Sequence, residues 1–152
     1  LTHEFKTAHG RIVRDGGGIK PDVETSMERR GNISYYLMKD FYFFDYATRY
    51  AAEHDTIPAP KDFKLSDEEY EGFKAFVKSK DFKYDKQSER ILSDLKEVAK
   101  FELLSIEIVK RYYYQKGEII ESIKNDKDLK EACRILGSKS RYDEILNLSG
   151  KH

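Results

Sequence analysis

A run of glycines near the start of the chain has the composition of a phosphate-binding loop. The segment Asp15-Gly16-Gly17-Gly18-Ile19-Lys20-Pro21-Asp22 combines three glycines with a lysine. A phosphate cradle of the P-loop type requires four residues between its glycines, followed by Gly-Lys-Ser or Gly-Lys-Thr. Here Ile19-Lys20-Pro21 follows the glycines instead, and Pro21 has no backbone N–H to donate to a phosphate. The spacing therefore favours a tight turn over a nucleotide site.

The other residue types that carry out chemistry lack the spacing that chemistry requires. The four histidines form no His-x-x-x-His pair, and Cys133 is the only cysteine, so neither a Cys-x-x-Cys pair nor an internal disulfide exists. No serine lies in a Gly-x-Ser-x-Gly turn or a Ser-x-x-Lys helix start. Carboxylate pairs are too numerous for any one of them to indicate acid–base catalysis. We predict no catalytic, cofactor-binding or metal-binding residue, and we interpret Cys133 as a small core residue.

Two runs of aromatic residues resemble stacking platforms for nucleic-acid bases. Tyr112-Tyr113-Tyr114 lies beside Lys110 and Arg111, and Phe41-Tyr42-Phe43-Phe44 forms the second run. Successive residues of a helix point about 100° apart, so three in a row do not make one flat surface. We expect one tyrosine ring in the core and the others at element borders. The phenylalanine-rich run is expected to pack against two neighbours, one of them in a partner chain.

Composition excludes several classes of protein. The chain has 152 residues, a formal net charge of zero and 13% aromatic residues, which supply enough apolar area for one domain of ordinary size. Positive charge forms no block or stripe, so we expect no nucleic-acid partner. No run of about 18 apolar residues exists, so we expect no membrane span, and no signal segment is visible. Because the chain begins with Leu1, we expect an excised fragment or a processed product.

The first part of the chain predicts a β arm. Strand-forming residues occupy positions 4–14 around a turn at His9-Gly10, and the triple glycine permits a second turn with positive φ. Lys20 should be extended because it precedes Pro21. The residues that we assign to this structural site are Gly10, Arg11, Asp15, Gly16, Gly17, Gly18, Pro21 and Asp22.

The remainder of the chain predicts helices. Apolar residues recur at helical spacing over 33–54, and Ser66 to Glu69 form a capping box at the start of a short helix. After a connector over 80–85, a long helix should run over 86–124 with a kink or break at Gly117. Shorter helices are predicted over 127–136 and about 140–147. The buried faces of these helices are expected to include Tyr36, Met38, Phe41, Phe44, Tyr46, Ala47, Tyr50, Tyr70, Phe73, Phe76, Val77, Leu92, Leu95, Ala99, Leu103, Ile106, Val109, Tyr113, Ile120 and Ile123.

The fold class predicted is therefore mainly α: a small helical domain of about four to five helices with an N-terminal β-hairpin or extended arm. We place the arm and linker in residues 1–32 and the helical domain in residues 33–152.

Several segments taken together resemble one family. The pattern Phe5-x-Thr7-x-x-Gly10-Arg11-x-Val13-x-Asp15-Gly16-Gly17-Gly18-Ile19-x-Pro21-Asp22 resembles the segment that closes the catalytic domain of carboxyl-terminal processing (tail-specific) serine peptidases. The helical region appended in one bacterial branch is similar to Phe44-Asp45-Tyr46-Ala47, Phe63-Lys64-Leu65-Ser66-Asp67-Glu68-Glu69-Tyr70, Asp81-Phe82-Lys83-Tyr84 and Arg111-Tyr112-Tyr113-Tyr114-Gln115-Lys116-Gly117. The likeness covers nearly the whole chain. The segment around 86–110 is shorter than the helical insert of that branch.

The resemblance implies a parent enzyme outside the cytoplasm, periplasmic or otherwise extracytoplasmic, that cleaves proteins near their C-termini. It also implies a serine nucleophile, a lysine base and a PDZ domain. No position here matches the serine and lysine motifs of the family, so this chain alone should be inactive and should need no cofactor. The implied partners are the catalytic and PDZ domains of the parent peptidase, with a homo-oligomer through the arm or the aromatic face as a further option.

Two hypotheses of different classes follow. In the first, the chain is the non-catalytic C-terminal helical domain of such a peptidase and acts in packing, oligomerisation or access of the substrate. In the second, it is a free-standing helical module that binds other proteins through its aromatic face. A small metal- or nucleotide-dependent enzyme is a third alternative with almost no support in the residues.

Overall fold

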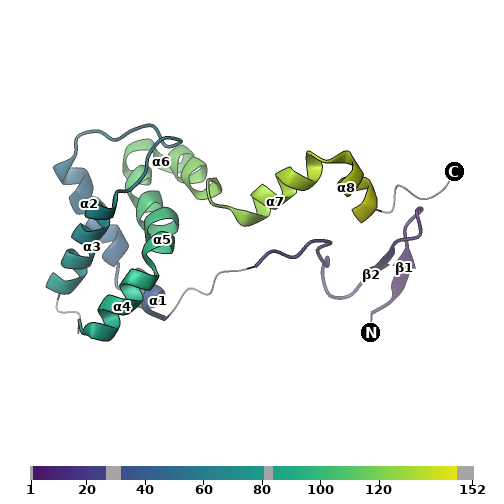
Figure 1. Cartoon of the computed structure of the whole chain (residues 1–152), viewed down its shortest axis with the longest axis horizontal. Coiled ribbons are helices and arrows are strands. Elements are labelled where there is room, and N and C mark those ends of the chain that lie inside the picture. Colours follow the sequence, from purple (N-terminus) through teal and green to yellow (C-terminus); the bar gives the residue numbers. More distant parts are fainter. Residues whose placement is uncertain (1, 27–31, 81–83, 147–152) are drawn as a thin grey trace. The chain divides into compact units, whose positions relative to one another are not determined.

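The computed structural model describes residues 2–26, 32–80 and 84–146, and this part of the chain is mainly helical with a short N-terminal antiparallel hairpin (Figure 1). The predicted fold class is confirmed. The chain divides into two compact units, one made of Glu28–Asn125 and the other of Leu1–Met27 together with Asp126–His152. Parts of the predicted linker and connector, residues 27–31 and 81–83, lie outside the described residues. The predicted domain boundary after residue 32 stays a prediction.

The elements of the smaller unit are β1 (Glu4–Lys6), β2 (Ile12–Arg14), α7 (Lys127–Leu136) and α8 (Lys139–Ile145). Those of the larger unit are α1 (Asn32–Lys39), α2 (Tyr42–Glu53), α3 (Asp67–Ser79), α4 (Lys86–Asp94), α5 (Lys96–Val98), the π-helix η1 (Ala99–Leu104) and α6 (Ser105–Ile123).

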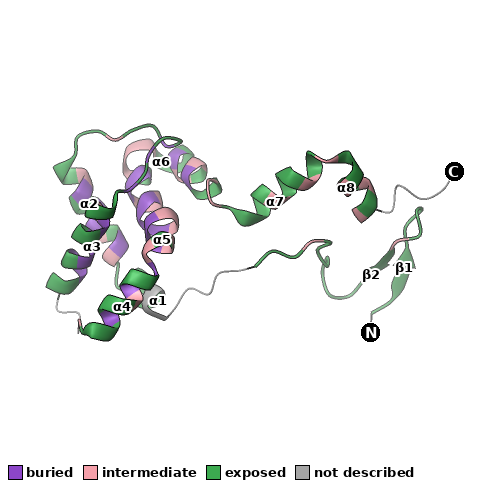
Figure 2. Ribbon diagram, in the orientation of Figure 1, coloured by how far each residue is buried: buried purple, intermediate pink, exposed green. Residues whose placement is uncertain are grey.

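The hydrophobic core of the larger unit lies between α2, α3, α4, η1 and α6 (Figure 2). The face of α3 predicted to be buried is buried, and Phe73 stacks on Phe43 of α2 with ring centroids 5.0 Å apart. The hydroxyl of Tyr70 donates a hydrogen bond of 2.6 Å to the backbone oxygen of Leu92, which satisfies a buried polar group and ties α3 to α4. Burying each such side chain contributes about 1.5–3 kcal/mol.

Helix α3 begins at the predicted capping box. The backbone N–H of Glu69 donates to the Ser66 hydroxyl over 3.1 Å, and the N–H of Ser66 donates to the Glu69 carboxylate over 2.6 Å. Asp67, in the first turn, accepts hydrogen bonds from Lys96 of α5 at 2.6 Å and Lys100 of η1 at 2.5 Å. These two ammonium groups, Lys100 foremost, lower the pKa of Asp67 to about 2. The Glu69 carboxylate therefore caps the start of the helix, and the Asp67 carboxylate fixes its first turn against the elements that follow.

The helix predicted over 33–54 is interrupted. Helix α1 ends at Lys39, and Phe41 adopts φ 60° and ψ 21°, the left-handed conformation, before α2 begins. The chain therefore turns between the two helices, and the predicted apolar face is divided. Tyr46, Ala47 and Tyr50 on α2 are buried as predicted. Burial of Tyr36, Met38, Phe41 and Phe44 is wrong, because all four side chains are exposed.

The long helix predicted over 86–124 is also divided, and its kink is not at Gly117. Helix α4 ends at Asp94, η1 has π geometry, and α6 is kinked at Tyr114, with φ 53° and ψ −150°. A π turn holds about one residue more than an α turn, so the buried face shifts along the sequence. Leu104 and Ile108 are fully buried, whereas the predicted core residue Ile123 is 44% exposed.

Both helices of the smaller unit were predicted. The Asp126 carboxylate accepts a hydrogen bond of 2.8 Å from the N–H of Leu129 at the start of α7, and Gly137 ends that helix. Cys133 is exposed on α7, so its interpretation as a core residue is wrong.

Candidate functional site

The N-terminal arm begins with the predicted hairpin. Strands β1 and β2 pair antiparallel with Phe5 opposite Val13. The turn between them is closed by hydrogen bonds of 2.9 Å from Gly10 N–H to the Thr7 oxygen and from Thr7 N–H to the Arg11 oxygen. Gly10 has φ 78°, a conformation that side chains other than glycine rarely adopt. The predicted turn at His9-Gly10 is therefore confirmed.

The triple glycine forms a second turn. Asp15 enters it with its carboxylate accepting a 2.7 Å hydrogen bond from the backbone N–H of His3, while its own N–H donates to the His3 oxygen. Gly16 and Gly18 have φ 83° and 81°, whereas Gly17 does not adopt a positive φ. A Cβ at Gly18 would meet no atom within 4 Å, so this glycine is needed for its backbone angle and not for space.

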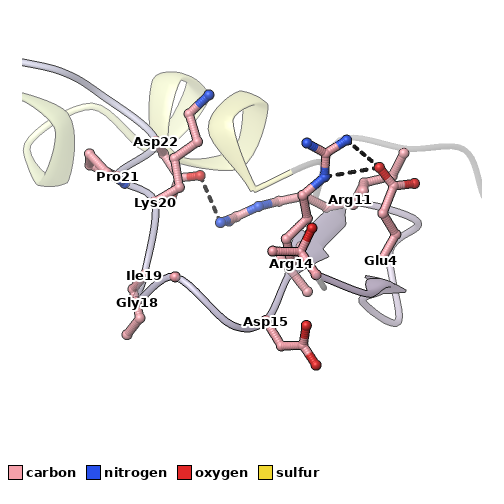
Figure 3. Close-up of a pocket in the computed structure, with 13 residues that line it drawn as sticks. Glu4, Arg11, Arg14, Asp15, Gly18, Ile19, Lys20, Pro21 and Asp22 are labelled. Atoms are coloured by element: carbon pink, nitrogen blue, oxygen red, sulfur yellow. Dashed lines mark hydrogen bonds and ion pairs between the residues drawn. The ribbon is translucent and has the colours of Figure 1, made fainter.

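The chain then returns to the hairpin through Lys20 and Pro21, and an ion pair closes the loop that it forms. A guanidinium nitrogen of Arg11 lies 2.7 Å from a carboxylate oxygen of Asp22, and the two side chains point toward each other (Figure 3). The loop encloses an open concavity of about 980 Å³. The residues assigned to the arm from sequence thus form one loop, held at its ends by Arg11 and Asp22.

Both arginines that line this concavity are paired with carboxylates. Arg11 is paired with Asp22, and Arg14 donates a 2.9 Å hydrogen bond from its Nε to Glu4 on the neighbouring strand. Over the described ranges 2–26, 32–80 and 84–146, no three His, Cys, Asp or Glu side chains gather as a metal site would require. In the same residues no helix is long and apolar enough to cross a membrane.

The arm exposes apolar side chains that have no core to cover them. Phe5 and Ile12 are more than half exposed, and Ile19 is 99% exposed. Both three-residue strands are exposed along their whole length. A two-stranded hairpin is only marginally stable alone, and unpaired strand edges invite pairing with another sheet. The arm therefore has the properties of a structural element that is completed by a partner.

The tyrosine run of α6 has a structural role. The Tyr113 hydroxyl donates a 3.1 Å hydrogen bond to the Ile57 oxygen, and the Tyr112 hydroxyl donates to the His54 oxygen. These two half-buried rings fasten the segment after α2 onto α6, whereas Tyr114 is 77% exposed. Tyr112 and Tyr113 pack against the core but are only partly buried, so the ring predicted in the core lies at its edge, and the three rings form no shared stacking surface.

A second candidate surface lies where α1 meets α2, and it includes Phe41 and Phe44 from the run that the sequence predicts to pack partly against a partner chain. Five large side chains at the junction of α1 and α2 are exposed, and we call this group the aromatic corner: Tyr35, Tyr36, Met38, Phe41 and Phe44. Their helical spacing predicted burial for most of them. The left-handed turn at Phe41 interrupts the predicted helix, and these side chains are exposed on either side of it. The sequence did not reveal the turn because no glycine or proline lies at that position.

Comparison with known proteins identifies the helical part of the chain. A family model described as "Probable PDZ-protease, C-terminal helical domain" matches residues 33–105 and 101–136. The two matched segments share residues 101–105, so they join at the end of η1 and the first residue of α6. No curated protein matches this chain. No solved structure matches it either.

The match covers more than half of the chain, from the first helix to the end of α7. The chain belongs to the family of C-terminal helical domains of probable PDZ-proteases.

Proposed function

We propose that this chain is the non-catalytic C-terminal part of a carboxyl-terminal processing serine peptidase, in which the arm completes the fold of the catalytic domain and the helices form an appended domain. The observation that carries the proposal is the arm, whose exposed Phe5, Ile12 and Ile19 precede a helical domain of a protease family. The serine nucleophile and lysine base would belong to the preceding part of the enzyme, which we expect to act outside the cytoplasm.

The geometry of the arm supports this role. Among the described strands, β1 and β2 pair only with each other, which leaves both outer edges open for strand addition. The Arg11–Asp22 ion pair and the two positive-φ glycines hold the returning chain beside the hairpin. A catalytic-domain sheet that extends onto one edge would bury the apolar side chains of the arm.

The test compares this chain with the complete product of the gene that encodes it. The complete product should cleave an unstructured peptide and react with a fluorophosphonate probe, a reagent for activated serines. The chain alone should do neither. Serine-dependent turnover by the chain alone would overturn the proposal, as would a complete product without a serine peptidase domain.

The alternative of a free-standing interaction module is favoured by one observation, the aromatic corner. Backbone hydrogen exchange separates the two. In a free-standing module, residues 4–22 should exchange equally slowly in this chain and in the complete product. In our proposal they should exchange fast in this chain and become protected when the catalytic domain is present.

A further inference from the structure

The aromatic corner is an exposed apolar surface on a well-packed unit. Its five side chains are between 51% and 65% exposed, all within the ten residues 35–44. Apolar residues scattered singly over a surface are ordinary, but a cluster of large ones marks an interaction site. By composition this corner resembles the centre of a protein interface, where aromatic residues and methionine are enriched.

The corner is fixed to the core from beneath. Leu37 of α1 is buried, and Phe43 is buried against Phe73. The Arg111 guanidinium lies over the Phe44 ring, 4.5 Å from its centroid, and donates a 2.6 Å hydrogen bond to the Phe44 backbone oxygen. Phe41 packs edge-on against Phe44, with centroids 6.4 Å apart. The surface is thus presented by a rigid support, which lowers the entropic cost of binding.

Phe41 holds a backbone conformation that its side chain disfavours. It has φ 60° and ψ 21°, and its ring is 65% exposed, so core packing does not compensate for the left-handed conformation. A glycine would adopt the same angles without that cost. Strain that packing does not explain is typical of residues kept for an interaction.

We infer that the aromatic corner is the surface through which the helical domain docks on the protease part of the same polypeptide; this inference rests on the proposed function. The arm ends at Asp22 and the family match begins at residue 33, so the corner starts directly after the linker. Ten intervening residues span on the order of 35 Å at most, which confines the corner to the neighbourhood of the catalytic domain. The tether gives the corner a high effective concentration next to the catalytic domain, which favours docking there without new contacts elsewhere.

The experiment is hydroxyl-radical footprinting with mass spectrometry on the complete gene product and on this chain alone. Tyr35 and Tyr36 report on the corner, and Tyr114, which is also exposed but lies on α6, is the internal reference. We expect labelling of Tyr35 and Tyr36 to fall several-fold in the complete product and labelling of Tyr114 to be unchanged.

Two variants of the complete product sharpen the test. Phe41→Gly removes the exposed ring and also the strain of a positive φ on a residue other than glycine. Met38→Ser removes apolar surface at a position that does not have a positive φ. Both should restore labelling of Tyr35 and Tyr36. The matched control is Tyr114→Gly, which also relieves a positive φ on an exposed aromatic residue and should leave the protection of the corner intact. In this variant the exposed Tyr142 replaces Tyr114 as the reference residue.

Each outcome decides the inference. Equal labelling of Tyr35 and Tyr36 in the two proteins, or equal protection of Tyr114, overturns docking through the corner. A dimer of this chain alone that Phe41→Gly abolishes assigns the corner to a second copy and overturns it as well. If the complete product cleaves peptides but its Tyr35 and Tyr36 are labelled as strongly as in this chain alone, this inference fails and the proposed function stands. If it contains no serine peptidase domain, the proposed function fails and this inference with it.

Discussion

Val109 and Gly117 of α6 approach so closely that a Cβ at residue 117 would lie 2.9 Å from Cγ1 of Val109, and 2.4 Å from Cβ of Tyr113. Gly117 is therefore required by close packing and is not a helix break. We predict that Gly117→Ala destabilises the larger unit by about 1–3 kcal/mol through overpacking, although alanine is the better helix former by about 1 kcal/mol.

Urea denaturation followed by tyrosine fluorescence measures this change, because all tyrosines except Tyr142 lie in the larger unit. Gly17→Ala is the control, since a Cβ there meets no atom within 4 Å. A Gly117→Ala variant as stable as the wild type would contradict the close approach.

Tyr114 has the second positive φ on a residue other than glycine in the described chain. Its angles lie near a region that is almost restricted to glycine, at a cost of about 1–3 kcal/mol. We predict that Tyr114→Gly is more stable than Tyr114→Ala by about 1 kcal/mol, the reverse of the order at an ordinary helix position. The free energies of unfolding of the two variants check this prediction. If Tyr114→Ala is more stable than Tyr114→Gly, as at an ordinary helix position, the kink is absent in solution.

Acid should weaken the larger unit through Asp67. The pKa of this carboxyl is about 2 in the folded protein, owing first to Lys100 and then to Lys96, against about 3.9 in an unfolded chain. A depressed folded pKa contributes stability that is complete above the unfolded value and is lost as pH falls, here from about 4 to about 2. Asp67→Asn should lower stability at pH 7 and flatten the acid limb of the stability curve.

The measurement is the urea midpoint from pH 7 to pH 2. Glu68→Gln removes an exposed negative charge from the same first turn of α3 and should leave the acid limb of the curve unchanged. An Asp67→Asn variant with the wild-type acid limb would show that the two lysines do not hold this carboxylate.

Alkali should weaken the same unit through Tyr84. Burial, followed by the hydrogen bond to Glu89, raises the pKa of Tyr84 to about 12, whereas an unfolded tyrosine titrates near 10. The folded state keeps the proton that the unfolded state releases, so stability falls as pH rises from about 10 to about 12. Burial also raises the pKa values of Tyr50 and Tyr70.

Tyr84→Phe should reduce the loss of stability over this alkaline range, and Tyr35→Phe, at the exposed corner, should leave it as in the wild type. Urea midpoints at pH 8 and pH 11, together with tyrosinate absorbance, give the result. An alkaline loss of stability in Tyr84→Phe as large as that of the wild type, or larger, would refute the assignment.

Elements with local signals were predictable from the sequence. Helix α3 begins at a capping box between Ser66 and Glu69, and its aromatic residues repeat at helical spacing, so its start and its buried face both follow from neighbouring residues. Helix α7 likewise has its cap at Asp126 and its end at Gly137. In both helices, the residues that determine where the helix begins or ends lie within one helical turn of that end.

Elements decided by distant contacts were not predictable. The turn at Phe41 and the kink at Tyr114 place bulky residues at positive φ, and neither position carries the glycine, asparagine or aspartate that would mark such a conformation in the sequence. In the arm, the turns at Gly10 and the triple glycine followed from composition. The Arg11–Asp22 ion pair did not, because it depends on how the chain returns after the second turn.

The π-helix η1 has a consequence for how the family tolerates changes of length. Its wider turn is completed by the N–H of Ser105, which donates to the Lys100 oxygen five residues earlier, and by the Ser105 hydroxyl on the same oxygen. A turn that already holds a surplus residue can lose it and become an ordinary α turn while the flanking helices stay intact. The two matched family segments join at the end of this turn. Insertions and deletions that distinguish members of the family should therefore concentrate here, where evolution can lengthen or shorten the chain without dismantling the core.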